Sequence, residues 1–342
     1  MTTTWKRPPT VMTAASILTA LLVASPIAFG SAAAKELTVA TFLPPTHPTT
    51  KLYEQIGKEI AEDSKGDLTF KVYAGGTLGA GPFQQYQRAV EGVADIVDIC
   101  HAFHAKVFSR TMLIVLPGSS TSAVDATTRL WDNEKLLEPD YKQVKNLFMY
   151  SVTQAVLTSR ESPVKTMADL KGKKVFIPGA AFAPTISAWG GTPVPMALEE
   201  MYNALSTGVV DVVALPAVSL GPPFRLGEVA KYSSVGVSGL FNPCGAIMNK
   251  KSYASLTPSQ KAILDKHTGR AMSLRAAKIF DGWAAASMKG AQEKNGLQRI
   301  DLTPEVRNSL REAAKPVVDK TIASLEQAGV KDARAVYDAM NK

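Results

Sequence analysis

Hydrophobic and polar positions follow two different periods along this chain. Residues 36–43 (ELTVATFL) alternate as a strand does, and residues 47–66 carry apolar positions at helical spacing up to a terminal glycine. A second strand is predicted over 68–76, a helix over 82–93 and a third strand over 94–100. This strand and helix order predicts an α/β fold with a parallel sheet covered by helices.

The same order returns in the second half of the chain. Residues 173–179 (KKVFIPG) predict a strand, and residues 198–205 predict a helix, because Leu198, Met201, Tyr202 and Leu205 share one face. Gly208 lies where a helix C-cap glycine is expected, and the β-branched run over 209–215 predicts a buried strand. A strand over 244–253 is expected to return to the first sheet. From residue 259 the chain is predicted to be helical, with almost no helix-breaking residues over more than 30 positions.

Two such units, with a chain that passes between them more than once, predict two lobes around a cleft with a hinge. We expect a first lobe from residues 35–153 and 242–283. The second lobe takes residues 154–241 and about 284–310, and residues 311–342 form C-terminal helices. The predicted fold is therefore a two-lobed α/β binding protein with crossing strands and a long C-terminal helical region.

The N-terminus predicts export. Lys6 and Arg7 precede the apolar stretch 11–30, which ends in small residues. This is the pattern of a secretory signal peptide over residues 1–34, cleaved after Ala34, and a retained membrane anchor is the alternative. No later segment has the roughly 18 uninterrupted apolar residues that a span needs. We therefore expect a periplasmic protein.

Charge and cysteine content narrow the function classes. The net charge of +8 is spread along the chain without basic runs or interleaved aromatic residues, so a nucleic-acid partner is not supported. Cys100 and Cys244 are too few for a disulfide scaffold and are not spaced as a metal site. The sequence favours two separately buried thiols. A bond stays open, because both cysteines are predicted to lie in the same lobe of an exported protein.

Known catalytic and phosphate-binding patterns are missing. The sequence contains no G-x-S-x-G, no P-loop and no H-E-x-x-H, and the glycine-rich residues 75–81 lack dinucleotide-loop spacing. His101 and His104 have a spacing that could place two imidazoles on one metal ion, but no second ligand pair is marked elsewhere. We predict no metal ion and no cofactor.

Paired carboxylates are the remaining catalytic candidates. Asp95 and Asp98 lie in a predicted strand, and Glu199 and Glu200 lie in the first turn of a predicted helix. Carboxylates in such places are usually structural or solvated. The scaffold of a binding protein is present without a reactive constellation, so we predict no enzyme activity.

Several segments resemble one protein family. The stretch GGTPVPMALEEMYNALSTGVVDVVALP, residues 190–216, resembles the motif G-A-T-P-V-P-M…E-x-Y-x-A-L-x-x-G-V-V-D-G of the solute receptors of TRAP (tripartite ATP-independent periplasmic) transporters. Other family-like pieces follow in order at residues 47–48, 76–79, 164–174, 227–232 and 248–264. The resemblance implies a receptor that closes two lobes on a ligand and delivers it to a membrane permease driven by an ion gradient.

The chain departs from this family at three ligand positions. The family strand K-(I/L/V)-R carries an arginine that clamps a substrate carboxylate, and this chain has Phe176 there. A second arginine of many members is replaced near Val156, and a polar contact in D-G-x-E-N-P is replaced by Leu215. Three apolar replacements predict a ligand with an apolar or aromatic portion.

The predicted function is a monomeric periplasmic receptor for a small organic molecule. The sequence does not decide whether this ligand carries a carboxylate. A secreted metal-dependent or hydrolytic enzyme and a ligand sensor for a signalling partner are the alternatives. The predicted lining residues come from strand ends and loops that face the cleft: Phe42, His47, Phe83, His101, Phe103, Phe176, Phe182, Trp189, Leu215 and Phe241.

Overall fold

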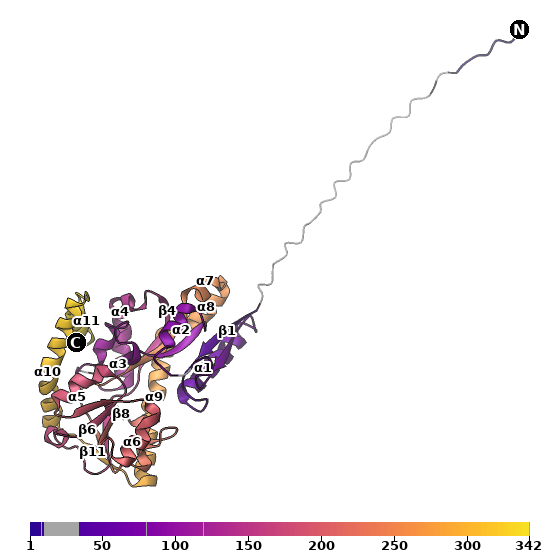
Figure 1. The fold of residues 1–342 in the computed structure, drawn as a ribbon. Helices are drawn as coiled ribbons and strands as arrows, with labels where there is room; N and C mark the ends of the chain where they lie inside the picture. Colours follow the sequence, from indigo (N-terminus) through magenta and orange to yellow (C-terminus); the bar gives the residue numbers. More distant parts are fainter. Residues whose placement is uncertain (8, 10–33, 80, 119, 342) are drawn as a thin grey trace. The chain divides into compact units, whose positions relative to one another are not determined.

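The structure is a computed structural model that describes residues 1–7, 9, 34–79, 81–118 and 120–341. Most of the predicted signal peptide lies outside the described residues. Residues Ala34–Lys342 form one compact unit (Figure 1). None of the helices in the described ranges is long and apolar enough to cross a membrane.

The first sheet has the strand order β2-β1-β3-β10-β4. The first three strands run parallel, as predicted, and α1 and α2 connect them. Strand β10 returns from far along the sequence, as predicted, but it pairs antiparallel with β3 and β4, so the sheet is mixed. The bounds are β1 Lys35–Ala40, α1 Pro48–Asp63, β2 Leu68–Tyr73, α2 Gln85–Glu91, β3 Ile96–Cys100, β4 Val144–Ser151 and β10 Pro243–Asn249.

The second sheet has the order β11-β9-β5-β8-β6-β7. The predicted strands β6 and β8 are present, and Gly208 ends α6 in the left-handed conformation, with φ 77°. Strand β5 runs antiparallel to its neighbours β8 and β9. The bounds are β5 Ala155–Ser159, β6 Lys174–Ile177, α5 Ala183–Ala188, β7 Thr192–Pro195, α6 Met201–Thr207, β8 Val212–Pro216, β9 Tyr232–Val235 and β11 Gln298–Asp301.

The chain passes between the sheets three times: from β4 to β5, from β9 to β10, and through the helices that follow β10. The predicted long helical region is present and consists of two helices, α8 (Pro258–Lys266) and α9 (Gly269–Asn295), which are separated at residues 267–268. Helix α9 packs on β4 of one sheet and on β11 of the other. The remaining helices are α3 Ala123–Asp132, α4 Glu134–Leu137, α7 Lys250–Ser255, α10 Pro304–Gln327 and α11 Ala333–Met340.

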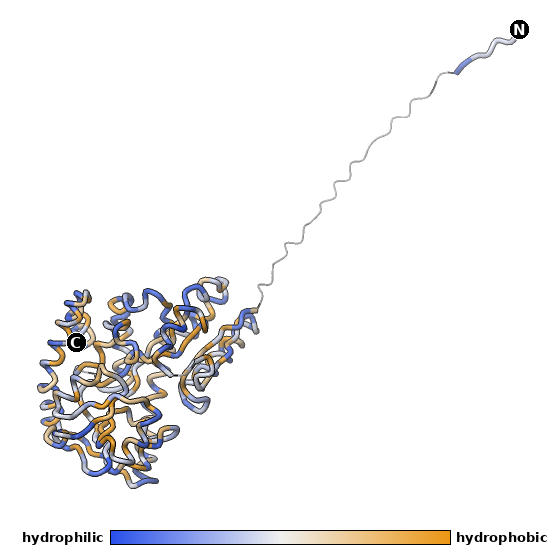
Figure 2. Tube along the Cα trace, in the orientation of Figure 1, coloured by the Kyte–Doolittle hydropathy of each residue, from blue (hydrophilic) through white to orange (hydrophobic). Residues whose placement is uncertain are grey.

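Strand alternation divides the apolar core between the two faces of each sheet. In β6, Val175 and Ile177 belong to one buried cluster and Phe176 to the other. Figure 2 shows hydrophobic positions concentrated along the inner strands and hydrophilic positions along the outer helices and loops. Because successive side chains point to opposite faces, a strand whose residues are all buried is packed on both sides.

Candidate functional site

A cavity of about 100 Å³ lies where the two sheets approach each other. It is bordered by residues that directly follow β1, β6 and β8, and by the segments that cross between the sheets. Ligands of open α/β sheets bind at these carboxyl ends of the strands. Two larger hollows, of about 610 and 620 Å³, have more polar walls, and we assign the ligand site to the cavity between the sheets.

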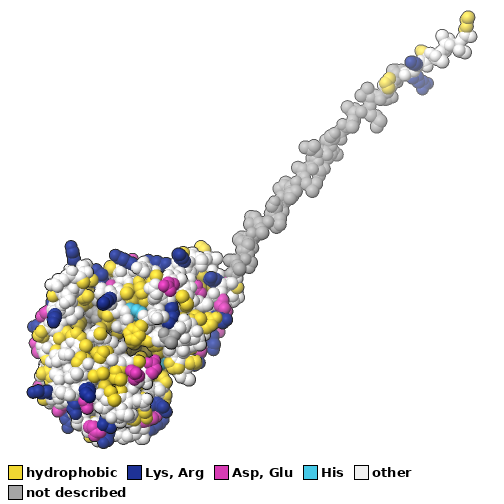
Figure 3. Space-filling model, in the orientation of Figure 1, with side chains coloured by type: hydrophobic (Ala, Val, Ile, Leu, Met, Phe, Trp, Pro, Cys, Tyr) yellow, Lys and Arg dark blue, Asp and Glu magenta, His cyan; other side chains and the backbone are white. Residues whose placement is uncertain are grey.

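The cavity wall is almost entirely apolar. The residues that line it come from both sheets, the crossing segments and α9: Phe42, Leu43, His47, Thr49, Cys100, Phe103, Tyr150, Val152, Pro178, Leu198, Leu215, Pro216, Val218, Ser219, Phe224, Asn242, Cys244 and Phe280. Figure 3 shows hydrophobic side chains gathered across the middle of the face it presents, with Lys and Arg mainly toward its edges. Among the described residues that line the cavity there is no Lys, Arg, Asp or Glu.

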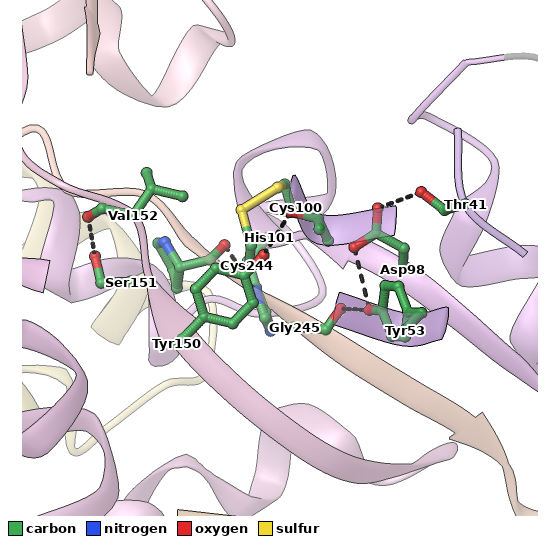
Figure 4. The surroundings of a disulfide bond; sticks show 12 residues. Thr41, Tyr53, Asp98, Cys100, His101, Tyr150, Ser151, Val152, Cys244 and Gly245 are labelled. Atoms are coloured by element: carbon green, nitrogen blue, oxygen red, sulfur yellow. Dashed lines mark hydrogen bonds between the residues drawn. A yellow bond between two sulfur atoms is a disulfide. The ribbon is translucent and has the colours of Figure 1, made fainter. Parts of the chain in front are cut away.

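A disulfide bond forms part of this wall (Figure 4). Cys100 at the end of β3 faces Cys244 in β10, and the two are bonded with Cα atoms 4.0 Å apart. The expectation of two separate thiols is therefore wrong. The sequence could not show the antiparallel register that places the two cysteines directly opposite each other.

The side chain of His47 lines the cavity. It is the N-cap of α1, and its Nδ1 accepts a hydrogen bond from the backbone N–H of Thr49 at 3.1 Å. The proton of the neutral ring is therefore on Nε2. Burial lowers the pKa of His47 to about 4, so the ring is neutral at neutral pH. The rings of Trp283 and Phe224 pack edge-on against it, at 5.1 and 6.1 Å between centroids.

A buried carboxyl group lies in β3 behind the wall (Figure 4). Thr41 Oγ1 donates to one oxygen of Asp98 at 2.8 Å, and Tyr53 Oη lies 3.2 Å from the other. Tyr53 Oη is also 3.1 Å from the carbonyl oxygen of Gly245, so it links β3 to β10. Burial raises the pKa of Asp98 to about 7 against the lowering effect of these hydrogen bonds.

Four of the predicted lining residues meet in the cavity: Phe42, His47, Phe103 and Leu215. Phe42 and Phe103 lie edge-to-face at 6.2 Å. Phe83 does not line the cavity. Its ring packs 5.2 Å from that of Phe103, and its side chain is 66% exposed. The rings of Phe42 and Phe83 therefore both pack against that of Phe103, and the rings that reach the cavity are those of Phe42 and Phe103.

The structure buries the other five predicted residues away from the cavity. His101 is bonded through Nδ1 to the carbonyl oxygen of Pro243 and through Nε2 to Tyr141 Oη. Trp189 donates a hydrogen bond to the carbonyl oxygen of Leu310, and both residues belong to the buried cluster that contains Val175 and Ile177. The remaining three have no more than 2% exposure: Phe176, Phe182 and Phe241.

Phe176 lies beneath the wall rather than in it. Its Cα partner in β8 is Val213, and the cavity begins two residues further along each strand, at Pro178 and Leu215. Alternation places Phe176 on the same sheet face as these two residues. Its ring therefore supports the wall from within the core.

The remaining candidate metal-binding and catalytic residues make hydrogen bonds within the fold. The side chain of His104 contacts the carbonyl oxygen of Pro82, and the described residues contain no group of three His, Cys, Asp or Glu that could hold a metal ion. Asp95 accepts hydrogen bonds from Thr38 and Ser252. Glu200 accepts from the backbone N–H of residue 197 at the start of the α6 region.

Two arginines, Arg110 and Arg160, make their contacts outside the cavity. Arg110 pairs with Asp332 at 2.8 Å, and Arg160 donates to the carbonyl oxygen of Ser206 and pairs with Glu161. Neither lines the cavity.

Sequence reasoning missed several lining residues, above all Asn242. Asn242 lies in the second crossing segment, just before β10, and its backbone oxygen accepts from the N–H of Val152 in the first crossing segment. Its side-chain Oδ1 is buried without a hydrogen-bond partner among the described residues. A polar residue between Phe241 and Pro243 was the available signal, but no periodic pattern distinguishes it from other loop residues.

Comparison with known proteins identifies the family to which this chain belongs. Residues 39–325 match the family model of bacterial extracellular solute-binding protein, family 7. The chain therefore belongs to this family, the periplasmic solute-binding proteins of TRAP transporters, and is a receptor rather than an enzyme. A solute-binding protein of Chromohalobacter salexigens is 30% identical over 254 residues, which cover 72% of this chain and 74% of the relative.

Two solved structures show the same fold with different ligands. A marine metagenome TRAP solute-binding protein in complex with 3-hydroxybenzoate is 25% identical, with a TM-score of 0.82, covering 91% of this chain and all of that one. A Bradyrhizobium TRAP solute-binding protein in complex with galacturonate is 25% identical, with a TM-score of 0.73, covering 89% and 100% of the two chains. The predicted family and two-sheet fold are confirmed.

Proposed function

We propose that this receptor captures a small organic molecule with an apolar or aromatic body and delivers it to an ion-gradient-driven TRAP permease. The apolar cavity between the sheets carries the proposal. Phenylalanine side chains from both sheets and α9 surround the space, among them Phe42, Phe103, Phe224 and Phe280. Such walls favour a ring or alkyl body, whereas a hydroxyl-rich sugar needs many hydrogen-bonding partners.

Similar receptors bind ligands of two chemical classes. One similar receptor binds an aromatic acid and another a sugar acid. Leu215 lines the cavity at a position where the family resemblance implies a polar ligand contact. The apolar wall therefore favours the aromatic class for this chain.

Export and hinge motion belong to the same proposal. We propose that residues 1–34 are a cleaved signal peptide, that the mature protein works as a monomer in the periplasm, and that its two lobes close on the ligand. The lobes proposed are residues 35–153 with 242–283, and residues 154–241 with about 284–310. N-terminal sequencing of the exported protein tests the cleavage site, and a radius of gyration that falls on ligand addition tests the closure.

A thermal-shift screen tests the ligand class. Benzoate, phenylacetate and their uncharged analogues are compared with succinate, malate and galacturonate. We expect the aromatic compounds to raise the melting temperature and the small hydroxylated or dicarboxylic acids to leave it unchanged. Strong stabilisation by succinate or malate, with no response to any aromatic compound, would contradict the proposed ligand class.

A further inference from the structure

The cavity offers hydrogen bonds but no charge. The nearest outer hollow, of about 370 Å³, shares Phe42 and Phe224 with it and contains Arg225. That guanidinium lies over the ring of Tyr202, 4.0 Å from Glu228, with its side chain 58% exposed. A ligand carboxylate inside the cavity would therefore be separated from water without a cationic partner.

Most polar groups of the wall are already satisfied internally. Ser219 Oγ donates to the carbonyl oxygen of Pro216, and Tyr150 Oη contacts Thr49 Oγ1 at 3.4 Å. The Thr49–Tyr150 contact uses only one of the two hydroxyl protons, and two further side chains of the wall keep free hydrogen-bonding capacity. His47 uses only Nδ1 within the described part of the chain, so its Nε2–H remains available.

Asn242 is the other side chain with free capacity. Its Oδ1 is buried and unpartnered, and no described residue bonds its amide nitrogen. Buried polar atoms normally have partners, so an unpartnered oxygen on a residue that borders the cavity indicates a side chain whose amide a ligand can engage. An Asn amide both donates and accepts, and it matches a ligand group that does the same.

We propose that the cavity recognises an uncharged hydrogen-bonding group, such as a carboxamide or a hydroxyl, carried on an aromatic or apolar body, and that Asn242 is the residue that determines this preference. The inference rests on the proposed function and names the polar end of the ligand. His47 supplies a second neutral donor at another point of the wall.

The physical reason is the difference between a carboxamide and a carboxylate in the same place. A carboxylate can only accept hydrogen bonds, so it cannot donate one to Asn242 Oδ1. It also loses its hydration without gaining a cation, because the apolar surroundings keep His47 neutral. A carboxamide of nearly the same shape avoids both costs.

Acid and amide pairs test the inference by isothermal titration of the full mature protein at pH 7.5. The pairs are benzoate with benzamide and phenylacetate with phenylacetamide. We expect at least one amide to bind about tenfold or more tightly than its acid, the scale of one buried polar group left unpaired. Asn242→Leu should weaken amide binding about tenfold, since Leu keeps the volume and removes the hydrogen bonds.

Asn146→Leu is the matched control. Asn146 also has a buried, unpartnered Oδ1, but it lies in β4 beside the hollow of about 620 Å³ and not in the cavity. This variant should bind the amides as the wild type does. The ratio of the wild type's affinities for the acid and for the amide remains a test even if Asn242→Leu does not fold.

The outcomes separate the inference from the function on which it rests. Acids that bind more tightly than their amides overturn the inference and leave the aromatic receptor standing, and a loss of acid binding in Arg225→Gln would then place the carboxylate at the outer hollow. Amide binding that is equal in Asn242→Leu and Asn146→Leu overturns the role of Asn242. If none of the four compounds binds, the aromatic ligand class itself fails.

Discussion

Cys100 and Cys244 face each other across the antiparallel strands β3 and β10, and the disulfide that joins them also lines the apolar cavity between the sheets. The two residues are 144 positions apart, so the bond ties the N-terminal strands to the chain that returns after the second sheet. One covalent link therefore serves both the stability of the first sheet and the shape of the site.

Removal of the disulfide should lower stability substantially. A bond that closes a loop of this length stabilises by about 4–5 kcal/mol in the chain-entropy model. We expect Cys100→Ala with Cys244→Ala to lower the free energy of unfolding by several kcal/mol and to weaken ligand binding. Urea unfolding measures the first effect and calorimetry the second.

Thiol labelling of the purified protein checks that the bond exists. The denatured, unreduced protein should show no reactive thiol, and the reduced protein should show two. Two labelled thiols without reductant would contradict the bonded state.

Asp98 should make stability depend on pH. Burial raises its pKa to about 7 from the ordinary 3.8, so between these values the native state holds a proton that the unfolded state has lost. This contribution is fully present below about pH 4 and is lost as the pH rises through about 7. The side chain of Asp98→Asn cannot ionise. The free energy of unfolding of this variant, measured relative to the wild type, should therefore rise by about 2–3 kcal/mol from pH 5 to pH 8.

Comparison of the two proteins removes the opposing effect of the histidines. Burial lowers the pKa of both His47 and His101 to about 4, which makes stability rise with pH up to about 6.5 in wild type and variant alike. Urea unfolding at both pH values measures the difference. If the free energies of unfolding of the wild type and Asp98→Asn differ by the same amount at pH 5 and pH 8, Asp98 does not titrate in this range.

Phe103 should contribute directly to ligand binding, and Phe83 should not. The two rings are neighbours, but only Phe103 lines the cavity. Phe103→Ala removes an aromatic contact and should weaken an aromatic ligand about tenfold, whereas Phe83→Ala should change its affinity much less. Titration of both variants with the same ligand makes the comparison, and equal losses would place the ligand elsewhere.

Phe176→Arg tests the position of Phe176 beneath the wall. The ring is fully buried, so the guanidinium would enter the core without a partner and should cost about 3–5 kcal/mol of stability. Phe83→Arg, at an exposed position, should have little effect. A Phe176→Arg protein with the wild-type melting temperature and new affinity for succinate would instead show that this position reaches the ligand.

The fold could be predicted because its determinants are local and periodic. The α/β order, the cap at Gly208 and the return of β10 to the first sheet follow from strand and helix patterns. The direction of β10 does not, since alternation is the same in parallel and antiparallel strands. The break between α8 and α9 was also missed, because no proline interrupts the pattern before it.

The sequence indicates which segments border the site, but not which of their side chains reach it. His101 and Phe103 belong to one short helical turn, yet His101 points to Tyr141 and Phe103 reaches the cavity. In β6, alternation indicates the face of Phe176 but not its depth below the strand end. Asn242 lies in a crossing segment without periodicity, so only its burial and missing partner mark it.

Native mass spectrometry of the purified receptor is the most direct test of the central claim, that the cavity holds a small molecule with an apolar or aromatic body. The protein is analysed as exported, without added ligand, and the bound mass is released and identified after denaturation. We predict a stoichiometric aromatic or alkyl-bearing compound whose bound fraction is lower in a Phe103→Ala preparation. A stoichiometric dicarboxylate such as succinate, or a sugar acid, would contradict this account of the site.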